Sequence, residues 1–366
     1  MVISLVYFTL FFLLFLVLLY FWVFRFKGGN LSAFDLQNWP KVSILVAARD
    51  EESYILTCLE ALSQLDYPKD KLEILVGDDR SQDQTKHLVK NFILDKPFIK
   101  LVSITHDVAG TKGKANVLAQ LAHLATSNYY FFTDADIQVP KTWVKSLLQQ
   151  LTGRYALATG ITTVTGSRWF DRMQALDWLY SLGLMQVVAD RGLPVSTMGN
   201  NMAITRQAYE AVGGFEGIPF SITEDVQLFS KVLKKGFSSC HVFSDSVLAL
   251  SAPAPSLRFL LHQRKRWMRG AWLLPWYIRA LLVFNSIYYP VWVPFFSYTS
   301  LSTALLIGLG KVLLQSIFVM KAVQRAGRSM RWYDVLFFEF YLLGISILLI
   351  VYYFLPFKIN WKGRLY

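Results

Sequence analysis

The feature that most constrains this chain is its amino-terminal stretch, because residues 1 to 24 contain no charged side chain. As a helix that rises about 1.5 Å per residue, this stretch is long enough to cross a hydrocarbon core of roughly 30 Å. A cleaved signal peptide is the alternative, but no basic segment precedes the apolar run and no small-residue cleavage site follows it. We therefore predict a transmembrane anchor over residues 1 to 27.

Charge and composition extend this prediction to the whole chain. Arg25 and Lys27 follow the anchor directly, and basic residues favour the cytosolic side of a membrane. Hydrophobic residues make up 54% of the sequence, and the net charge of +12 suits anionic headgroups or phosphates. We expect a multi-pass integral membrane protein in a bacterial plasma (inner) membrane, with a cytosolic catalytic domain.

Residues 40 to 256 have the composition of one globular domain. Its two cysteines, Cys58 and Cys240, form no paired motif and are predicted to be core residues. Apolar runs predict strands at 42–47, 72–77, 129–133 and 156–160, and helical patterns separate them at 53–65, 84–92 and 116–124. This alternation predicts an α/β fold with a mostly parallel sheet, whose ligands bind beyond the carboxyl ends of the strands.

Apolar character returns in the carboxyl-terminal part of the chain. No charge occurs over 280–310 or 340–357, so we predict two or three spans within about 279–357. Pro290 and Pro294 would either follow an interfacial helix or lie in the turn of a hairpin. We assign 257–289 to interfacial helices and 290–366 to the membrane region, and flanking charge leaves the side of the carboxyl terminus open.

Two acidic motifs follow predicted strands. In VGDDRSQDQT, Asp78 and Asp79 end a strand, where an acid can accept hydrogen bonds from a nucleotide's base or ribose. In FFTDADI, Asp134 and Asp136 can hold a hard cation such as Mg²⁺ or Mn²⁺ that bridges to phosphates. The alternatives are an ordinary capping turn for the first motif and a chance occurrence of the short D-x-D pattern for the second.

Two further motifs lie at predicted helix starts. Glu224 and Asp225 open a helical pattern, where acids either complement the helix dipole or supply a general base for a hydroxyl nucleophile. Lys112 and Lys114 lie among glycines in GTKGKAN, which suits a nucleotide diphosphate. This spacing is not that of a P-loop, so ATPase chemistry is not supported.

The order of all these motifs is more specific than any one of them. The series VAARDEE, GDDRSQD, KGKAN, TDAD, GNNMAITR, TED and QRKRW, within residues 41 to 270, resembles the family 2 glycosyltransferases. These membrane-bound enzymes include cellulose, chitin and hyaluronan synthases and ceramide glucosyltransferase. The resemblance implies a GT-A domain, which is a Rossmann-like nucleotide-diphospho-sugar transferase domain with a mostly parallel sheet, flanked here by transmembrane helices at both ends.

The resemblance also implies roles for individual residues. Asp225 would be the catalytic base and Glu224 its neighbour near the acceptor, while Asp134 and Asp136 would bind the metal and the diphosphate. The donor, a UDP-sugar, would contact Asp50, Glu51, Asp79, Lys112, Lys114, Asp134, Asn201, Gln263, Arg266 and Trp267. Arg80 and Gln82 depart from the family's DDGST-like stretch, so the uracil-side loop is expected to differ in detail.

The opening of the QRKRW helix requires a separate interpretation. Arg266 would meet the pyrophosphate and Trp267 would form a wall for a sugar ring, as the resemblance implies. Arg264, Lys265 and Arg269 are instead predicted to face lipid headgroups, because basic interfacial helices suit the bilayer surface.

The predicted reaction is metal-dependent sugar transfer to a hydroxyl of a lipid-linked or glycan acceptor, with inversion at the anomeric carbon. A processive polysaccharide synthase is the alternative, and a homo-oligomer or partner subunit would then complete its channel. A non-catalytic membrane-tethered GT-A protein is a remote alternative, because the motif acids and the Arg266–Trp267 pair are all present. We expect membrane lipids as partners and no nucleic acid, because the basic cluster lies at a membrane boundary.

Overall fold

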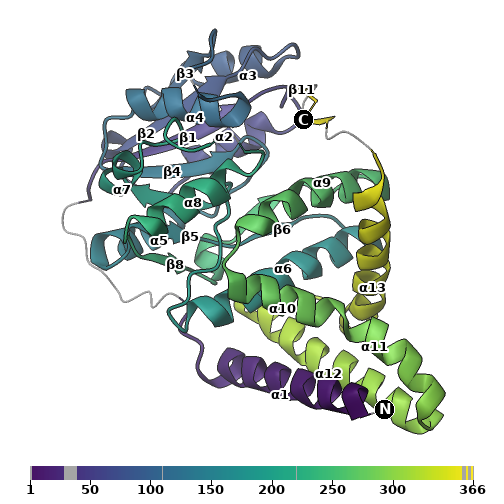
Figure 1. The fold of residues 1–366 in the computed structure, drawn as a ribbon. Helices are drawn as coiled ribbons and strands as arrows, with labels where there is room; N and C mark the ends of the chain where they lie inside the picture. The colour runs from purple at the N-terminus through teal and green to yellow at the C-terminus, as the bar shows by residue number, and fades with distance from the viewer. Residues whose placement is uncertain are drawn as a thin grey trace.

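The computed structural model describes residues 2–28, 39–108, 110–219 and 221–356, together with two short strands at 360–361 and 364–365. Figure 1 shows an α/β part that contains the central sheet, and a separate group of long helices to which both α1 (Val2–Phe24) and α12 (Leu301–Arg325) belong. The predicted α/β fold with long apolar helices at both ends is confirmed.

In the described part of the chain, seven strands form the central sheet, in the order β3-β2-β1-β4-β7-β5-β8. The strands are β1 (Val42–Ala48), β2 (Leu72–Asp78), β3 (Ile99–Ser103), β4 (Tyr129–Asp134), β5 (Leu157–Thr159), β7 (Met202–Thr205) and β8 (Ser239–His241). Only β7 runs antiparallel to its neighbours, β4 and β5. The four predicted strands correspond to β1, β2, β4 and β5, whereas β3, β7 and β8 were not predicted.

The sheet is covered on both faces, which explains why its strands read as continuous apolar runs. Ile44 lies in one core, with α2 (Ile55–Ser63), α3 (Thr85–Phe92) and α5 (Trp143–Gly153). Leu45, the next residue, lies in the other core, with α4 (Gly113–Leu124), α7 (Arg206–Ala211) and α8 (Glu224–Lys234). Consecutive side chains of β1 therefore point to opposite faces and bury on each.

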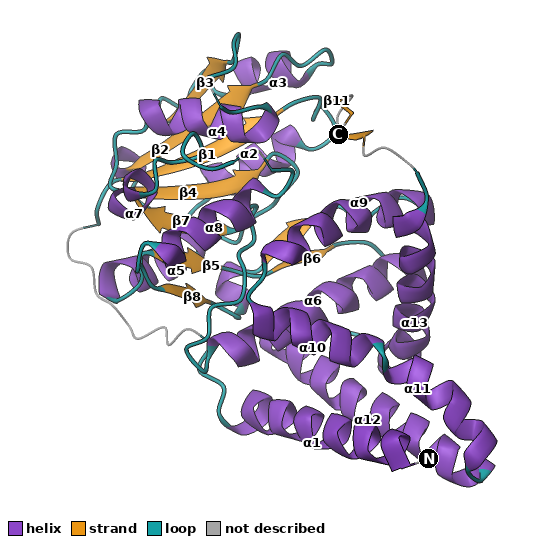
Figure 2. Ribbon diagram, viewed as in Figure 1, coloured by secondary structure: helices purple, strands orange, loops and turns teal. Residues whose placement is uncertain are grey.

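A long helix that the sequence did not reveal, α6 (Trp169–Ala189), lies between the sheet and the long apolar helices (Figure 2). It contacts α1, α12 and α13 (Trp332–Phe354), and also β6 (Thr162–Val164), which pairs with β9 (Ala249–Ser251). Most of its residues are buried, and the buried residues lie on more than one side of the helix. A helix without a single apolar face has no helical stripe in its sequence, which is why it escaped prediction.

The remaining elements complete the chain. They are η1 (Lys69–Lys71), η2 (Asp245–Val247), α9 (Leu257–Gly270), η3 (Ala271–Leu273), α10 (Trp276–Ser286), α11 (Tyr288–Phe295), η4 (Phe296–Tyr298), β10 (Asn360–Trp361) and β11 (Arg364–Leu365). Within the described residues, four helical stretches are long and apolar enough to cross a membrane: Val2–Phe24, Trp276–Tyr298, Leu301–Arg325 and Trp332–Phe354.

The helix bounds correct the sequence prediction at both prolines. The chain turns at Thr299 and Ser300, whose hydroxyl caps α12, rather than at Pro290 or Pro294, and both prolines lie within α11. The apolar helices also extend beyond the uncharged runs, because α12 contains the buried Lys311 and α13 the buried Glu339. These two side chains form an ion pair with each other. Charged residues paired in this way can lie in helices that pack in an apolar surrounding.

Candidate active site

The strand order of the sheet reverses next to β1. The chain passes from β1 to β2 on one side and later to β4 on the other, and both strands run parallel to β1. Ligands of such sheets bind beyond the carboxyl ends of the strands at this reversal. The register places Asp78 beside Ala48 and Asp134 beside Ala47. The acids after β2 and β4 therefore lie at one edge, two strand spacings or about 10 Å apart.

Asp79 is almost completely buried at this edge, with 3% of its surface exposed. Its N–H donates to the Ala48 carbonyl over 2.9 Å. Arg49 Nη1 lies 3.7 Å from Asp79 Oδ2, and Arg80 Nε lies 3.3 Å from Asp79 Oδ1. Two guanidinium groups thus fix the orientation of the Asp79 carboxylate. Arg80, one of the two residues at which the sequence departs from the DDGST-like stretch, supplies one of these groups.

The loops after β1 and β2 are fastened together by hydrogen bonds. Asp50 Oδ1 accepts from the Gln82 N–H over 2.8 Å, and the Glu51 N–H donates to Thr85 Oγ1 over 2.7 Å. Asp50 and Arg80 both adopt left-handed backbone conformations, with φ of 51° and 58°. Such conformations are costly for residues other than glycine and persist where the surrounding structure enforces them. Asp50, Glu51 and Asp79 are thereby held in one rigid unit.

Lys114, in the first turn of α4, joins three parts of the site. Its Nζ contacts Asp134 Oδ1 and lies 3.7 Å from Glu224 Oε1. Burial alone would lower the pKa of Lys114, but the Asp134 and Glu224 carboxylates outweigh it and raise the pKa above its ordinary value. Lys114 therefore carries a positive charge between β4 and α8. Lys112 is exposed at the residue before the helix.

Asp134 and Asp136 lie on either side of the buried Ala135 at the end of β4, and both are half-buried. Cys58 lies beneath them, with its Sγ 3.5 Å from the Asp134 carbonyl oxygen. Among the described residues, no group of three or more His, Cys, Asp or Glu side chains is arranged to hold a metal ion. One or two carboxylates are the ligands by which Mg²⁺ is usually bound together with waters and substrate phosphates.

Asp225 is held by backbone N–H groups at the start of α8. Gly199 N–H donates to its Oδ2 over 2.8 Å and Val226 N–H donates to its Oδ1 over 2.9 Å. A Cβ added at Gly199 would lie 2.6 Å from Asp225 Oδ2, so only glycine permits this approach. The GNN motif therefore contributes its glycine to the site, a residue that sequence reasoning did not single out.

Glu224 lies beside Asp225 and is largely buried, with 13% of its side chain exposed. Burial raises its pKa from the ordinary value of 4.5 to about 7, because the attraction of Lys114 only partly offsets desolvation and the Asp225 carboxylate adds to the rise. A carboxyl group with a raised pKa beside other charged groups is typical of acid–base sites.

Asn201 is buried directly before β7, next to the carboxyl end of β4. Its amide donates to the Ile161 and Val247 carbonyls over 2.7 and 2.8 Å and accepts from Trp143 Nε1 over 2.8 Å. The side chain is completely buried. Asn201 therefore joins the β7 strand to two other segments, and we leave it out of the proposed donor site.

The QRKRW helix, α9, ends against the segment that carries Glu224. A Cβ added at Gly270 would lie 2.8 Å from Thr223 Oγ1, so helix and segment are in close contact, as the ribbon also shows (Figure 1). Gln263, Arg266 and Trp267 are all half-buried in this helix. The site therefore combines the edge of the sheet, the start of α8 and the end of α9.

The prediction that Arg264 and Lys265 face lipid headgroups is wrong. Arg264 Nη2 lies 2.5 Å from Asp177 Oδ2 of α6. Lys265 is buried and donates to the Leu355 carbonyl over 2.7 Å at the end of α13. Both side chains therefore hold α9 to neighbouring helices, because a buried acid and unpaired helix-end carbonyls are strong partners for a cation. Arg269 is exposed.

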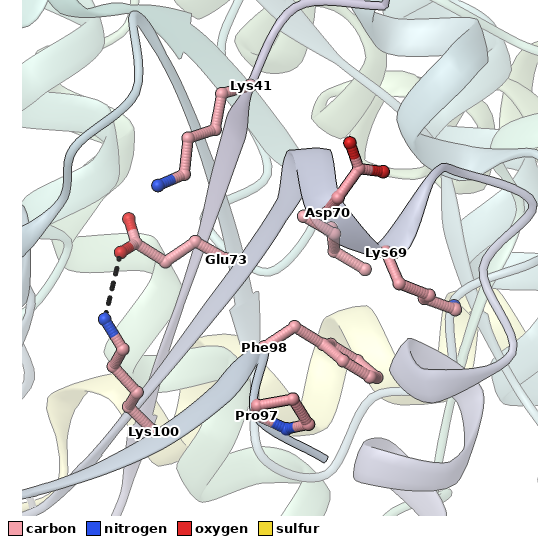
Figure 3. Close-up of a pocket in the computed structure, with 8 residues that line it drawn as sticks. Lys41, Lys69, Asp70, Glu73, Pro97, Phe98 and Lys100 are labelled. Carbon is pink, nitrogen blue, oxygen red and sulfur yellow. Dashed lines mark ion pairs between the residues drawn. The ribbon is translucent and has the colours of Figure 1, made fainter.

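A separate shallow pocket of about 360 Å³ lies near the start of β2 and the chain before β3 (Figure 3). It is lined by Lys41, Lys69, Asp70, Leu72, Glu73, Pro97, Phe98 and Lys100. Glu73 lies 3.6 Å from Lys100 and accepts a hydrogen bond from Ser43 over 2.7 Å. The pocket contains none of the predicted site residues, and the acids after β2 and β4 lie at the opposite, carboxyl end of the strands.

The order and direction of the strands match the GT-A fold, which is the fold of a class of glycosyltransferases. A solved mannosyltransferase from Pyrobaculum calidifontis, in complex with GDP-Man and Mn²⁺, shares this fold with a TM-score of 0.54. It is 18% identical, and the match covers 88% of this chain and 98% of that one.

Within this class, residues 7–366 match glycosyl transferase family 21, and the chain belongs to that family. The resemblance to membrane-bound GT-A glycosyltransferases is thus confirmed, whereas the expected family number, 2, is not.

Two curated relatives indicate the range of similar proteins. A probable glycosyltransferase of Bacillus subtilis, YdaM, is 28% identical over 64% of this chain and 56% of its own length. A beta-monoglucosyldiacylglycerol synthase of Trichormus variabilis is 28% identical over 64% of this chain and 49% of its own length. The chain thus spans about half the length of the curated relatives that it matches.

Proposed function

We propose that this protein transfers a sugar from a UDP-sugar to a hydroxyl group of a lipid acceptor, with inversion at the anomeric carbon. The observation that carries the proposal is the contact of Lys114 with Asp134 and Glu224, directly beside Asp225, at the carboxyl edge of the sheet. One small region thus contains a cation for phosphate, a carboxylate suited to metal binding and a carboxylate suited to proton transfer.

The nucleotide would bind across the loops that follow β1 and β2. Asp79, with Asp50 and Glu51 beside it, would accept hydrogen bonds from the uracil and the ribose. Lys112 and Lys114, at the start of α4, would bind the diphosphate together with backbone N–H groups. The related mannosyltransferase contains a nucleotide-diphosphate sugar, GDP-Man, which supports this class of donor. Competition by UDP and by GDP tests the choice of base.

Asp134 and Asp136 would hold a divalent cation, Mg²⁺ or Mn²⁺. Such ions keep several waters and bind through one or two carboxylates and the substrate phosphates, and the two side chains at the end of β4 fit that requirement. Mn²⁺ in the related mannosyltransferase supports a divalent cation. When bound, it would offset the negative charge of the leaving diphosphate.

Asp225 would accept the proton of the acceptor hydroxyl. The bond between this oxygen and the anomeric carbon forms as the bond from that carbon to the diphosphate oxygen breaks, and the nucleoside diphosphate leaves. One base on one face implies one in-line displacement, so an α-linked donor gives a β-linked product. Arg266 would bind the departing pyrophosphate, while Gln263 and Trp267 would close over the donor sugar.

A lipid acceptor is favoured by the relatives named beta-monoglucosyldiacylglycerol synthase and by the apolar helices that adjoin α6 and α9. In this proposal the helices cross the membrane and the sheet lies in the cytosol, on the side of Arg25 and Lys27. The acceptor hydroxyl would then reach Asp225 from the headgroup layer.

The test uses the full chain in lipid nanodiscs with radiolabelled UDP-sugars and, for comparison, GDP-mannose. We expect label from a UDP-sugar to extract into organic solvent, and Asp225→Asn to lower the rate of that transfer by about 10²- to 10⁴-fold. Label that stays in a water-insoluble polymer would favour the processive alternative instead. No transfer from any nucleotide sugar, with acceptor lipids present and Mg²⁺ or Mn²⁺ added, would overturn the proposal.

A further inference from the structure

α6 contacts the motif helix α9 and also the chain that leads into it. Gln174 lies one turn of α6 before Asp177, the residue that contacts Arg264. Its Oε1 accepts the Ala254 N–H over 2.8 Å and its Nε2 donates to the Ala254 carbonyl over 3.2 Å. These bonds fix the chain just before α9 begins. Asp177 then pairs with Arg264 in the middle of α9. Residues 174 and 177 are one turn apart, so the same side of α6 makes both contacts.

Two side chains, Arg264 and Trp178, contact the Trp267 ring. The Arg264 guanidinium lies over it, 4.7 Å from the ring centroid, and the Trp178 ring meets it edge to face at 5.1 Å and 87°. Asp177, which holds Arg264, and Trp178 are neighbours in α6. Both are buried, with 5% and 9% of their surface exposed. Trp178 therefore contacts Trp267 directly, and Asp177 acts on it through Arg264.

We propose that Asp177 and Trp178 are positioning residues for sugar transfer, which act by fixing Arg264 and Trp267 relative to Glu224 and Asp225. The inference rests on the proposed function, because it assigns Trp267 to the wall of the sugar site. Two residues in the middle of QRKRW then position the helix. Arg264 binds it to α6, and Lys265 binds it to the end of α13. α6 thereby connects the apolar helices to the transfer site.

This role predicts a loss of turnover without a matching loss of donor binding. A reacting group displaced by about 1 Å costs roughly 10²-fold in rate, whereas the proposed uracil and ribose contacts of Asp50, Glu51 and Asp79 lie on the loops after β1 and β2 and not on α9. We expect Asp177→Asn to lower kcat by about 10²-fold and to change the donor KM less than about threefold. Trp178→Ala should act in the same direction, and Trp178→Phe, which keeps an aromatic edge, should restore most of the rate.

The experiment compares these variants with Asp171→Asn as a matched control. Asp171 is also buried in α6 and paired with an arginine, Arg168 Nη2 at 2.8 Å, but this arginine is the residue directly before α6 and not part of α9. Steady-state kinetics of the full chain in nanodiscs, UDP binding and the unfolding temperature are measured for each variant. We expect Asp171→Asn to alter only the unfolding temperature.

A double variant of Asp177 and Arg264 separates a positioning role from a simple loss of stability. If Asp177 acts through Arg264, adding Asp177→Asn to Arg264→Gln should lower kcat by less than about twofold further, because the interaction is already lost. Should Asp177→Asn fail to fold, Asp177→Glu replaces it with the same expected division between kcat and KM.

The outcomes are distinct. A wild-type rate for folded Asp177→Asn, or equal losses for Asp177→Asn and Asp171→Asn, would overturn the inference. Absence of transfer by the wild-type chain would instead overturn the proposed function.

Discussion

Two regions of the molecule contain a lysine with little exposure beside acidic side chains, and they differ in charge balance. At the edge of the sheet, Lys114 contacts Asp134 and Glu224, with Asp225 and Asp136 close by in the chain. Between α12 and α13, Lys311 contacts Glu339, whose Oε1 also accepts the Tyr289 hydroxyl. The first group has more acids than bases, whereas the second is balanced one to one.

The balance indicates what each region can do. An excess of carboxylates attracts a cation and can accept a proton, so the Lys114 group suits a reacting site. The Lys311–Glu339 pair lies against tyrosine rings. Lys311 Nζ is 4.9 Å and 4.7 Å from the Tyr288 and Tyr289 ring centroids. Because its two charges balance, the pair requires no further charged partner. We interpret the Lys311–Glu339 pair as a structural connection between two apolar helices.

The largest effect is expected at the acidic group. Asp225→Asn removes the proposed base but keeps its shape and its place at the start of α8. We expect the rate of sugar transfer to fall by about 10²- to 10⁴-fold, with UDP binding in Mg²⁺ nearly unchanged. Single-turnover transfer and equilibrium UDP binding measure the two quantities.

The matched control for this change is Asp95→Asn, an exposed acid paired only with the adjacent Lys96 among the described contacts, which should leave both quantities unaltered. Near-normal transfer by Asp225→Asn would reassign the base.

The next effect concerns the balanced pair. Lys311→Met leaves Glu339 buried without its partner, and we expect the free energy of unfolding to fall by about 3 to 5 kcal/mol. Removing both charges, in Lys311→Met/Glu339→Gln, should recover most of this loss. Unfolding in detergent measures both variants. A double variant as unstable as the single one would show that the pair is more than a structural connection.

The pH dependence of stability tests the acidic group at the edge of the sheet. The pKa of Glu224 is about 7 in the folded protein and 4.5 ordinarily, so the folded state binds the proton more tightly. The stability that this proton contributes is complete below pH 4.5 and is lost as the pH rises through 7, by up to about 3 kcal/mol. Unfolding temperatures between pH 5 and 8 should fall accordingly.

Glu224→Gln mimics the protonated side chain and should flatten this dependence, with a gain in stability at pH 8. An unchanged slope in the variant would remove Glu224 as its source.

The smallest effect is expected for the cation. Asp136→Ala should weaken UDP binding about 10-fold in Mg²⁺ or Mn²⁺, the low end of losses at metal sites, and should have little effect in EDTA. Calorimetric titration with and without metal measures the difference. Equal affinity of variant and wild type in Mn²⁺ would exclude Asp136 from the metal site.

Sequence reasoning succeeded where a local pattern carries the physical cause. The strands that became β1, β2 and β4 were predicted to within one residue, because runs such as VSILVA are apolar on both faces. It could not reveal distant partners. The Asn201 amide joins Ile161, Val247 and Trp143 through hydrogen bonds, and no local signal in the sequence reveals such partners.

The amino-acid sequence by itself determined the apolar helices, the alternation of strands and helices, and the order of the motif acids. Each depends on residues close together in the chain. Only the tertiary structure decided that Lys114 joins Asp134 to Glu224, that Lys311 and Glu339 cancel each other, and that Arg264 and Lys265 turn inward. The reason is that the energy of a buried charge depends on what the fold brings within a few ångströms of it.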